Sequence, residues 1–175
     1  MAARTRRWVI GLDRSELGLL ALDEALATAV ERGGEVHVVV VYQPLGDATN
    51  LYGGPEDPAM ERELDRLTPL VTARLDKLGP DAPPLMVHGV IGAAAEALVV
   101  LASALDADAI FVGTHGRTGL QRALLGSVAE EVVRTAGCAV HVARPRHHDP
   151  QVRWPSHHTE RTLRGTIVDS QAFAH

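Results

Sequence analysis

The sequence predicts an α/β protein: a single doubly wound, Rossmann-like domain whose five-stranded parallel sheet is flanked by four helices. Short β-branched runs alternate with longer segments in which apolar residues recur every three or four positions, a pattern typical of parallel strands joined by helices. The length of 175 residues and the apolar fraction of 46% suit one domain with one core. The expected strand order is 3-2-1-4-5, followed by a C-terminal extension.

The first part of the chain supplies two strands and the helix between them. A β-branched run predicts the first strand over 8–13, and helical spacing of apolar residues predicts a helix over about 15–32. Gly33-Gly34 ends this helix, because glycine readily terminates helices. The second strand, 36–42, is apolar almost throughout except for His37, as expected for a strand that is buried on both faces.

The middle of the chain begins with a polar loop over 43–57, which is long enough to form a lid or an interaction surface. A stripe of apolar residues then predicts a helix over 58–78. A proline-rich turn leads into the third strand, 85–91. The helix over 93–105 is built largely of small residues, which suit close packing on a sheet.

The last part of the domain repeats the same alternation. We expect a fourth strand over 109–113, a loop over 114–126, a helix over 127–136 and a fifth strand over 139–143. The periodicity fails from Pro145 onward. The predicted domains are therefore a body over 1–144 and a polar, His-rich extension over 145–175.

Composition excludes several classes of function. The net charge of −5, the pI near 6.0 and the presence of only two Phe, two Trp and two Tyr argue against a nucleic-acid partner. Cys138 is the sole cysteine and cannot form an internal disulfide, and no apolar leader begins the chain. The longest apolar runs fall short of the roughly 18 residues that cross a bilayer. We expect a cytoplasmic protein with no membrane partner.

Two strand ends carry the residues of chemical interest. Strand one finishes in Gly11-Leu12-Asp13 and strand four in Gly113-Thr114-His115-Gly116. Ligands of doubly wound sheets bind outside the carboxyl ends of the strands, where the strand order reverses. If strands one and four pair there, these two ends lie side by side.

The stretch after strand four has the features of a phosphate cradle. Ser127 and Glu130 are spaced as a capping box, which predicts a helix start with free N–H groups that attract anions. Gly113, Gly116 and Gly126 lack the Cβ atoms that would keep a phosphate away from the backbone. An alternative stays open, in which these glycines only turn the chain and Ser127 only caps a helix. Asp13 has a similar alternative as the N-cap of the first helix.

The order of these motifs resembles the ATP-binding signature of the universal stress protein family. The resemblance rests on Gly113, two residues, Gly116, nine residues, and Gly126-Ser127, together with Leu124 to Val128 and Cys138 to Val142. Asp13-Arg14-Ser15 and the helix start Gly92 to Glu96 are similar as well. The similarity spans about residues 6–144. Alanines replace the proline that many members carry at two turns, positions 94 and 139.

The resemblance implies a role for each residue of the site. Asp13 and Val41 would contact adenine or ribose, the glycines after strand four would lie against ribose and the inner phosphates, and the start of the following helix would hold the outer phosphates. The implied ligand is ATP, with Mg²⁺. The full set expected to contact it is Gly11, Leu12, Asp13, Val41, Gly113, Thr114, His115, Gly116, Gly126, Ser127 and Val128.

No catalytic residue is assigned. The Walker motif, with its phosphate-binding lysine, is absent. Arg117 and Arg122 either replace that lysine in part or are solvated loop charges. His115 either contacts or accepts a phosphate, or is a turn residue. No metal is expected at the tail histidines, because adjacent histidines rarely face one ion.

These features favour a regulatory protein: a homodimer, paired through the strand 139–143, that responds to ATP in the stress response and acts on an unidentified protein partner. Slow hydrolysis or autophosphorylation is compatible with it. One alternative is an enzyme of the adenine-nucleotide hydrolase group that acts on a second substrate near 43–57. The other is a docking protein that uses its tail.

Overall fold

The computed structural model describes residues 4–43, 58–114 and 125–146. They form one five-stranded sheet in which every pair of neighbours is parallel, in the order β3-β2-β1-β4-β5. The predicted fold class and strand order are confirmed. The strands are β1 (Arg7–Gly11), β2 (Glu35–Tyr42), β3 (Leu85–Ile91), β4 (Ala109–Gly113) and β5 (Ala139–Ala143).

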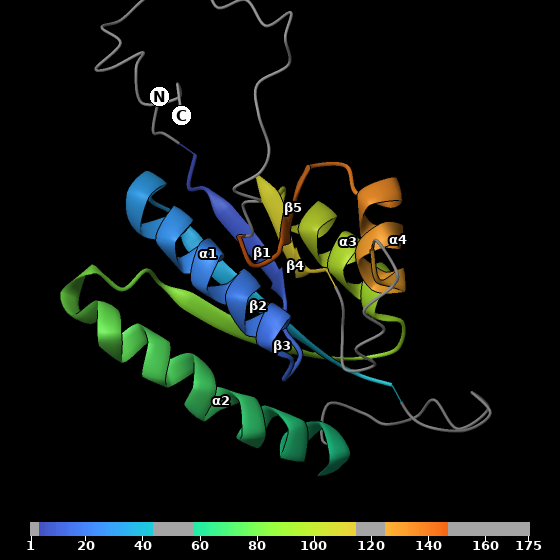
Figure 1. The fold of residues 1–175 in the computed structure, drawn as a ribbon, viewed down its shortest axis with the longest axis horizontal. Helices are drawn as coiled ribbons and strands as arrows, with labels where there is room; N and C mark the ends of the chain where they lie inside the picture. The colour runs from blue at the N-terminus through green and yellow to red at the C-terminus, as the bar shows by residue number, and fades with distance from the viewer. Residues whose placement is uncertain (1–3, 44–57, 115–124, 147–175) are drawn as a thin grey trace, which may run out of the picture. The chain divides into compact units, whose positions relative to one another are not determined.

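Four α-helices cover the sheet, as predicted. Helices α1 and α2 lie on one face, and α3 and α4 lie on the other (Figure 1). Within the described ranges, no helix combines the length and the apolarity needed to span a membrane. The helices are α1 (Glu16–Arg32), α2 (Pro58–Leu78), α3 (Ala94–Ala104) and α4 (Ser127–Thr135), and a short 3₁₀ turn, η2 (Gly79–Asp81), follows α2.

Most predicted boundaries hold within a residue, but the first strand is shorter than predicted. It ends at Gly11 rather than at Asp13. The Leu12 N–H still donates to the Val39 carbonyl at 3.0 Å, and the chain then leaves the sheet toward α1. Asp13 therefore lies in the turn beyond the sheet, where its side chain can face a ligand.

The core consists of two apolar layers, one on each side of the sheet. Side chains of a strand alternate between the faces, so Ile10 packs toward α1 and α2 while Val9 packs toward α3 and α4. Trp8 meets Phe111 edge to face, with ring centroids 6.3 Å apart. Both layers contain fully buried strand residues, such as Ile10 in one and Val9 in the other. Their packing holds the strands against the helices on each side.

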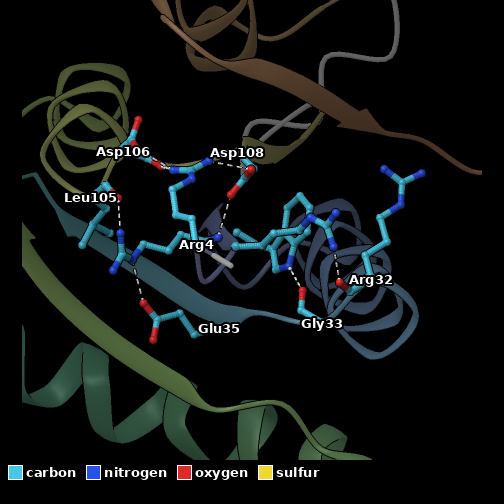
Figure 2. Close-up of polar contacts among 10 residues, drawn as sticks. Arg4, Arg32, Gly33, Glu35, Leu105, Asp106 and Asp108 are labelled. Carbon is cyan, nitrogen blue, oxygen red and sulfur yellow. Dashed lines mark hydrogen bonds and ion pairs between the residues drawn. The ribbon is translucent and has the colours of Figure 1, made fainter. Parts of the chain in front are cut away.

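Arginine side chains form ion pairs at the amino ends of the strands, opposite the carboxyl ends that carry the predicted site residues (Figure 2). The Arg4 guanidinium contacts the carboxylates of Asp106 and Asp108 at 2.6 and 2.7 Å. The Arg7 side chain donates to Glu35 at 2.8 Å, and its main-chain N–H donates to Asp108 at 2.9 Å. These pairs are partly exposed, so each contributes little to stability, about 0–1 kcal/mol.

Three of the predicted segments lie mostly outside the described residues. They are the loop over 43–57, the loop over 114–126 and the extension, from residue 147 onward. The division of the chain at 144 and 145 stays a prediction.

Candidate functional site

The strand order reverses between β1 and β4, in the centre of the sheet. Trp8, Val9 and Ile10 pair in register with Ala109, Ile110 and Phe111. From β1 the chain crosses to β2 on one side, and from β4 it crosses to β5 on the other. The ends of β1 and β4 are therefore neighbours, as predicted, at the position where doubly wound sheets bind ligands.

The carboxylate of Asp13 is fixed by the residue two positions later. Its Oδ1 accepts hydrogen bonds from the Ser15 N–H at 3.1 Å and from the Ser15 hydroxyl at 2.5 Å. The Ser15 hydroxyl oxygen in turn accepts from the Gly18 N–H at 3.0 Å and is the N-cap of α1. The alternative that Asp13 itself caps α1 is wrong, because Ser15 occupies the cap and Asp13 orients it.

Gly18 brings helix α1 into contact with this carboxylate. A Cβ atom at position 18 would lie 2.4 Å from Asp13 Oδ1, closer than real Cβ atoms come to a neighbour, and 3.0 Å from the Asp13 carbonyl oxygen. Sequence reasoning missed both Gly18 and Ser15 as parts of the site. The available signal was the spacing Asp-x-Ser followed by a glycine in the first helical turn.

Gly113 has a packing role that the sequence did not reveal. A Cβ atom there would lie 2.8 Å from the carbonyl carbon of Leu17 and 3.0 Å from the N atom of Gly18. The first turn of α1 thus lies directly against the end of β4. The missing Cβ of Gly113 accommodates this helix, whereas the sequence suggested that it made room for a phosphate. Contact between the Gly113 backbone and a ligand stays a prediction.

Thr114 ties the end of β4 to the start of α4. It is buried, its N–H donates to the Ala143 carbonyl at 3.2 Å, and its carbonyl accepts from the Gly126 N–H at 2.6 Å. The α4 start is therefore held beside the ends of β1 and β4. Residues 115–124, which include His115, Gly116, Arg117 and Arg122, lie outside the described part of the chain.

Helix α4 begins without a side-chain cap. Gly126 is its N-cap, with extended φ and ψ of −71° and 153°, and the Gly126 carbonyl accepts from the Glu130 N–H at 2.9 Å. The predicted capping box is wrong, because Ser127 is the first helical residue and lies one position too late to cap. Since the first N–H groups of a helix have no intrahelical partner, those of Ser127 and Val128, both exposed residues, can bind an anion.

The other predicted contacts lie along the same edge. Val41 is half-buried near the end of β2, beside Val90 of β3. Leu12 is buried and its N–H already donates to Val39, so a ligand would have to use the Leu12 carbonyl. At Gly11 a Cβ would meet the Leu98 side chain at 2.8 Å, which places α3 close to the end of β1.

A buried carboxylate holds a guanidinium next to Asp13, a feature that sequence reasoning also missed. Arg14 Nε lies 3.4 Å from Oε1 of Glu63 on α2, and Arg66 Nη1 lies 3.6 Å from Oε2. Only 5% of Glu63 is exposed. Helix α2 thereby contributes one carboxylate and one guanidinium to this end of the sheet. Among the described residues, no three or more His, Cys, Asp or Glu are grouped to hold a metal.

A parallel sheet with helices on both faces and one reversal of strand order defines a Rossmann-like α/β protein. The model of the universal stress protein family matches residues 4–144. The chain therefore belongs to the universal stress protein family.

Curated relatives agree with this assignment. A universal stress protein of Methanocaldococcus jannaschii is 33% identical over 143 residues, which cover 79% of this chain and 82% of the relative. One from Mycolicibacterium smegmatis is 31% identical over 138 residues, covering 79% of this chain and 45% of the relative. The chain thus spans about half the length of the latter protein.

Solved structures share the fold. A universal stress protein of Lactobacillus plantarum has a TM-score of 0.68 at 22% identity, and the match covers 81% of this chain and 99% of that one. A universal stress protein in complex with cAMP has a TM-score of 0.58 at 25% identity, covering 81% and 98%. One from Archaeoglobus fulgidus in complex with dAMP has a TM-score of 0.55 at 21% identity, covering 81% and 98%.

Proposed function

We propose that this protein is a nucleotide-responsive regulatory protein of the stress response, which acts in the cytoplasm and binds ATP with Mg²⁺ at the carboxyl edge of its sheet. The start of α4 carries the proposal. It has no side-chain cap and is tied by Gly126 to Thr114, next to the ends of β1 and β4. Structural neighbours that hold cAMP or dAMP support an adenine nucleotide as the ligand class.

The described residues fit such a ligand. The N–H groups of Ser127 and Val128 would donate to the outer phosphate oxygens, and the helix dipole would favour their charge. The Asp13 carboxylate, oriented by Ser15, would accept from ribose hydroxyls or from the adenine amine. Val41 would supply an apolar wall for the base. Mg²⁺ would be held mainly by the phosphates of the nucleotide.

The charges at this edge suit binding better than rapid phosphoryl transfer. The chain contains a single lysine, Lys77, and it lies in the last turn of α2, which leads to the start of β3 at the opposite edge. No lysine can therefore clamp the outer phosphates as in the Walker motif. We propose slow ATP hydrolysis or autophosphorylation, with turnover below about 1 per second, the low end for ordinary enzymes.

Asp13→Asn is expected to weaken Mg-ATP binding by about tenfold to a hundredfold, since a hydrogen bond to a charged group contributes about 1.5–3 kcal/mol. Asparagine keeps the shape of the side chain, and its amide oxygen can still accept from Ser15. Calorimetric titration of nucleotide-free protein measures both affinities.

The absence of heat and of a thermal shift with wild-type protein would contradict nucleotide binding itself. Equal affinity in the two proteins would remove Asp13 from the site only. Mass spectrometry of the ligand released from freshly purified protein identifies the nucleotide that is carried. A turnover above about 1 per second would favour the alternative of a hydrolase-type enzyme.

We also propose that β5 pairs with the same strand of a second copy. Strand β5 lies at the end of the strand order, with β4 as its neighbour, so one side of it can accept another strand. Ala139→Lys adds a charge at an exposed position of this edge and is expected to shift the protein from dimer to monomer in light scattering. Val133→Lys, which adds the same charge at a residue 50% exposed on α4, should leave the dimer intact. A monomeric wild type would end this proposal.

A further inference from the structure

Two histidines on neighbouring strands, His37 and His88, contact each other, and neither belongs to the proposed nucleotide site. His37 on β2 is 1% exposed, and His88 on the edge strand β3 is half-buried. His37 Nδ1 lies 3.0 Å from His88 Nε2. The rings are stacked, with centroids 5.3 Å apart and planes inclined by 23°. This contact is a side-chain link between β2 and β3.

The second nitrogen of His37 faces a carboxylate. His37 Nε2 lies 3.3 Å from Glu35 Oε1, without the alignment of a hydrogen bond. The same oxygen accepts from Arg7 Nε at 2.8 Å. The hydrogen bond from Arg7, followed by the contact with His37, lowers the pKa of Glu35, so this carboxylate is ionised near neutral pH.

Among residues 4–43, 58–114 and 125–146, few other charges face the pair. On this side of the sheet β1 contributes Arg7, which also donates to the Leu105 carbonyl at the end of α3, and Asp108 after α3 accepts from the Arg7 N–H. Helix α3 carries one titratable residue, the exposed Glu96 of its first turn. Helix α2 packs on the other face, with Met60 against Gly89, so its charged residues lie across the sheet from the pair.

The short N–N distance limits how many protons the pair can bind. Two facing ring nitrogens 3.0 Å apart share one hydrogen, so the contact survives while at least one of them keeps a lone pair. Protonation of both rings would set two N–H groups against each other and place two positive charges in stacked rings. In the unfolded chain each imidazole titrates independently near pH 6.5. Burial, followed by the charge of His37, lowers the pKa of His88.

We propose that the His37–His88 pair is an acid-sensitive link that holds the edge strand β3 to β2 near neutral pH and breaks when both rings are protonated. The sign follows from proton linkage. Below about pH 6.5 the folded pair binds fewer protons than the same residues in the unfolded chain, so acid favours opening. The stabilisation is fully present above that pH and is lost as the pH falls.

Opening of the His37–His88 pair would also affect the candidate nucleotide site, because β2 and β3 continue from the pair to that site. Two positions beyond His88, Val90 pairs in register with Val41, and the Gly92 N–H donates to the Tyr42 carbonyl at 3.1 Å. The link therefore lies on the same strand as the wall proposed for the base.

The test compares urea unfolding of the full chain at about pH 7.5 and about pH 5.5 in wild type and in His88→Gln. Glutamine presents an amide that can donate to or accept from His37 at either pH. Acidification should raise the unfolding equilibrium constant of both proteins, and we expect this rise to be about three- to tenfold larger in wild type. That factor corresponds to up to one proton that the folded pair does not bind, over about one pH unit below 6.5. Met86→Gln is the matched control, because Met86 lies on the same strand, is 46% exposed and carries no titratable group, so this variant should keep the wild-type rise.

An equal rise in His88→Gln and wild type would overturn the proposal. Should the variant fail to fold, nitrogen-15 spectra of wild-type histidine rings decide the question: the proposal requires the pair to take up its two protons in two separated steps, and uptake of both protons with one midpoint contradicts it. These measurements need no nucleotide. A protein that does not bind ATP would therefore not contradict the proposal for the histidine pair. A histidine pair that is not acid-sensitive would likewise not contradict nucleotide binding.

Discussion

Ser127→Asp is expected to weaken nucleotide binding by at least about a hundredfold while leaving the fold intact. The substitution places a carboxylate at the first residue of α4, where the proposed phosphates lie. Two unit charges about 4 Å apart repel by about 4 kcal/mol near a protein surface, and about 1.4 kcal/mol corresponds to a factor of ten. The titration described for Asp13→Asn measures the loss.

The same substitution should raise thermal stability slightly, which separates this effect from unfolding. An acidic residue in the first helical turn stabilises a helix by about 0.3–1 kcal/mol through the dipole, and Ser127 is exposed. Ser127→Asn provides a neutral control of similar size that should bind with nearly wild-type affinity. Undiminished affinity in the aspartate variant would mean that the phosphates do not lie at the start of α4.

Gly113→Ala is expected to destabilise the protein by about 1–3 kcal/mol, the usual cost of overpacking. The added methyl group would lie within 3.0 Å of three backbone atoms in the first turn of α1, and backbone cannot move aside as a flexible side chain can. Denaturant unfolding measures the loss. Because that turn also positions Asp13, nucleotide affinity should fall as well.

Gly137→Ala is the matched control for this substitution. Nothing lies within 4 Å of the Cβ that it would add, and its φ is not in the left-handed region. Its stability should equal or slightly exceed that of wild type, by up to about 1 kcal/mol from reduced chain entropy. Equal stability of the two variants would refute the close packing of α1 on β4.

The fold was predictable because local pattern and tertiary structure agree throughout the sheet. The apolar run of β2 indicated a strand buried on both faces, and β2 does lie between β1 and β3. His37 was the one polar exception in that run. His37 is accommodated there because its ring contacts His88 on β3. His88 is distant in the sequence, so no local pattern could predict this contact.

The site was predictable in position but not in detail. The adjacency of the β1 and β4 ends follows from the fold class. The Ser127/Glu130 pattern suggested a capping box because it matches the residue types, but the cap depends on where φ and ψ become helical, and Gly126 holds that position. The packing roles of Gly18 and Gly113 depend on distances between segments that are remote in sequence. The roles of His115 and Gly116 stay predictions.

The hydrogen bond between Thr114 and Gly126 has a consequence for how such a protein can diversify. Its donor and its acceptor are backbone atoms, and Gly126 has a negative φ of −71°. Side-chain changes at either position therefore leave the bond in place as long as proline, which has no N–H, is not introduced at 126. A family built on this scaffold can vary both side chains while the same bond keeps β4 and α4 together.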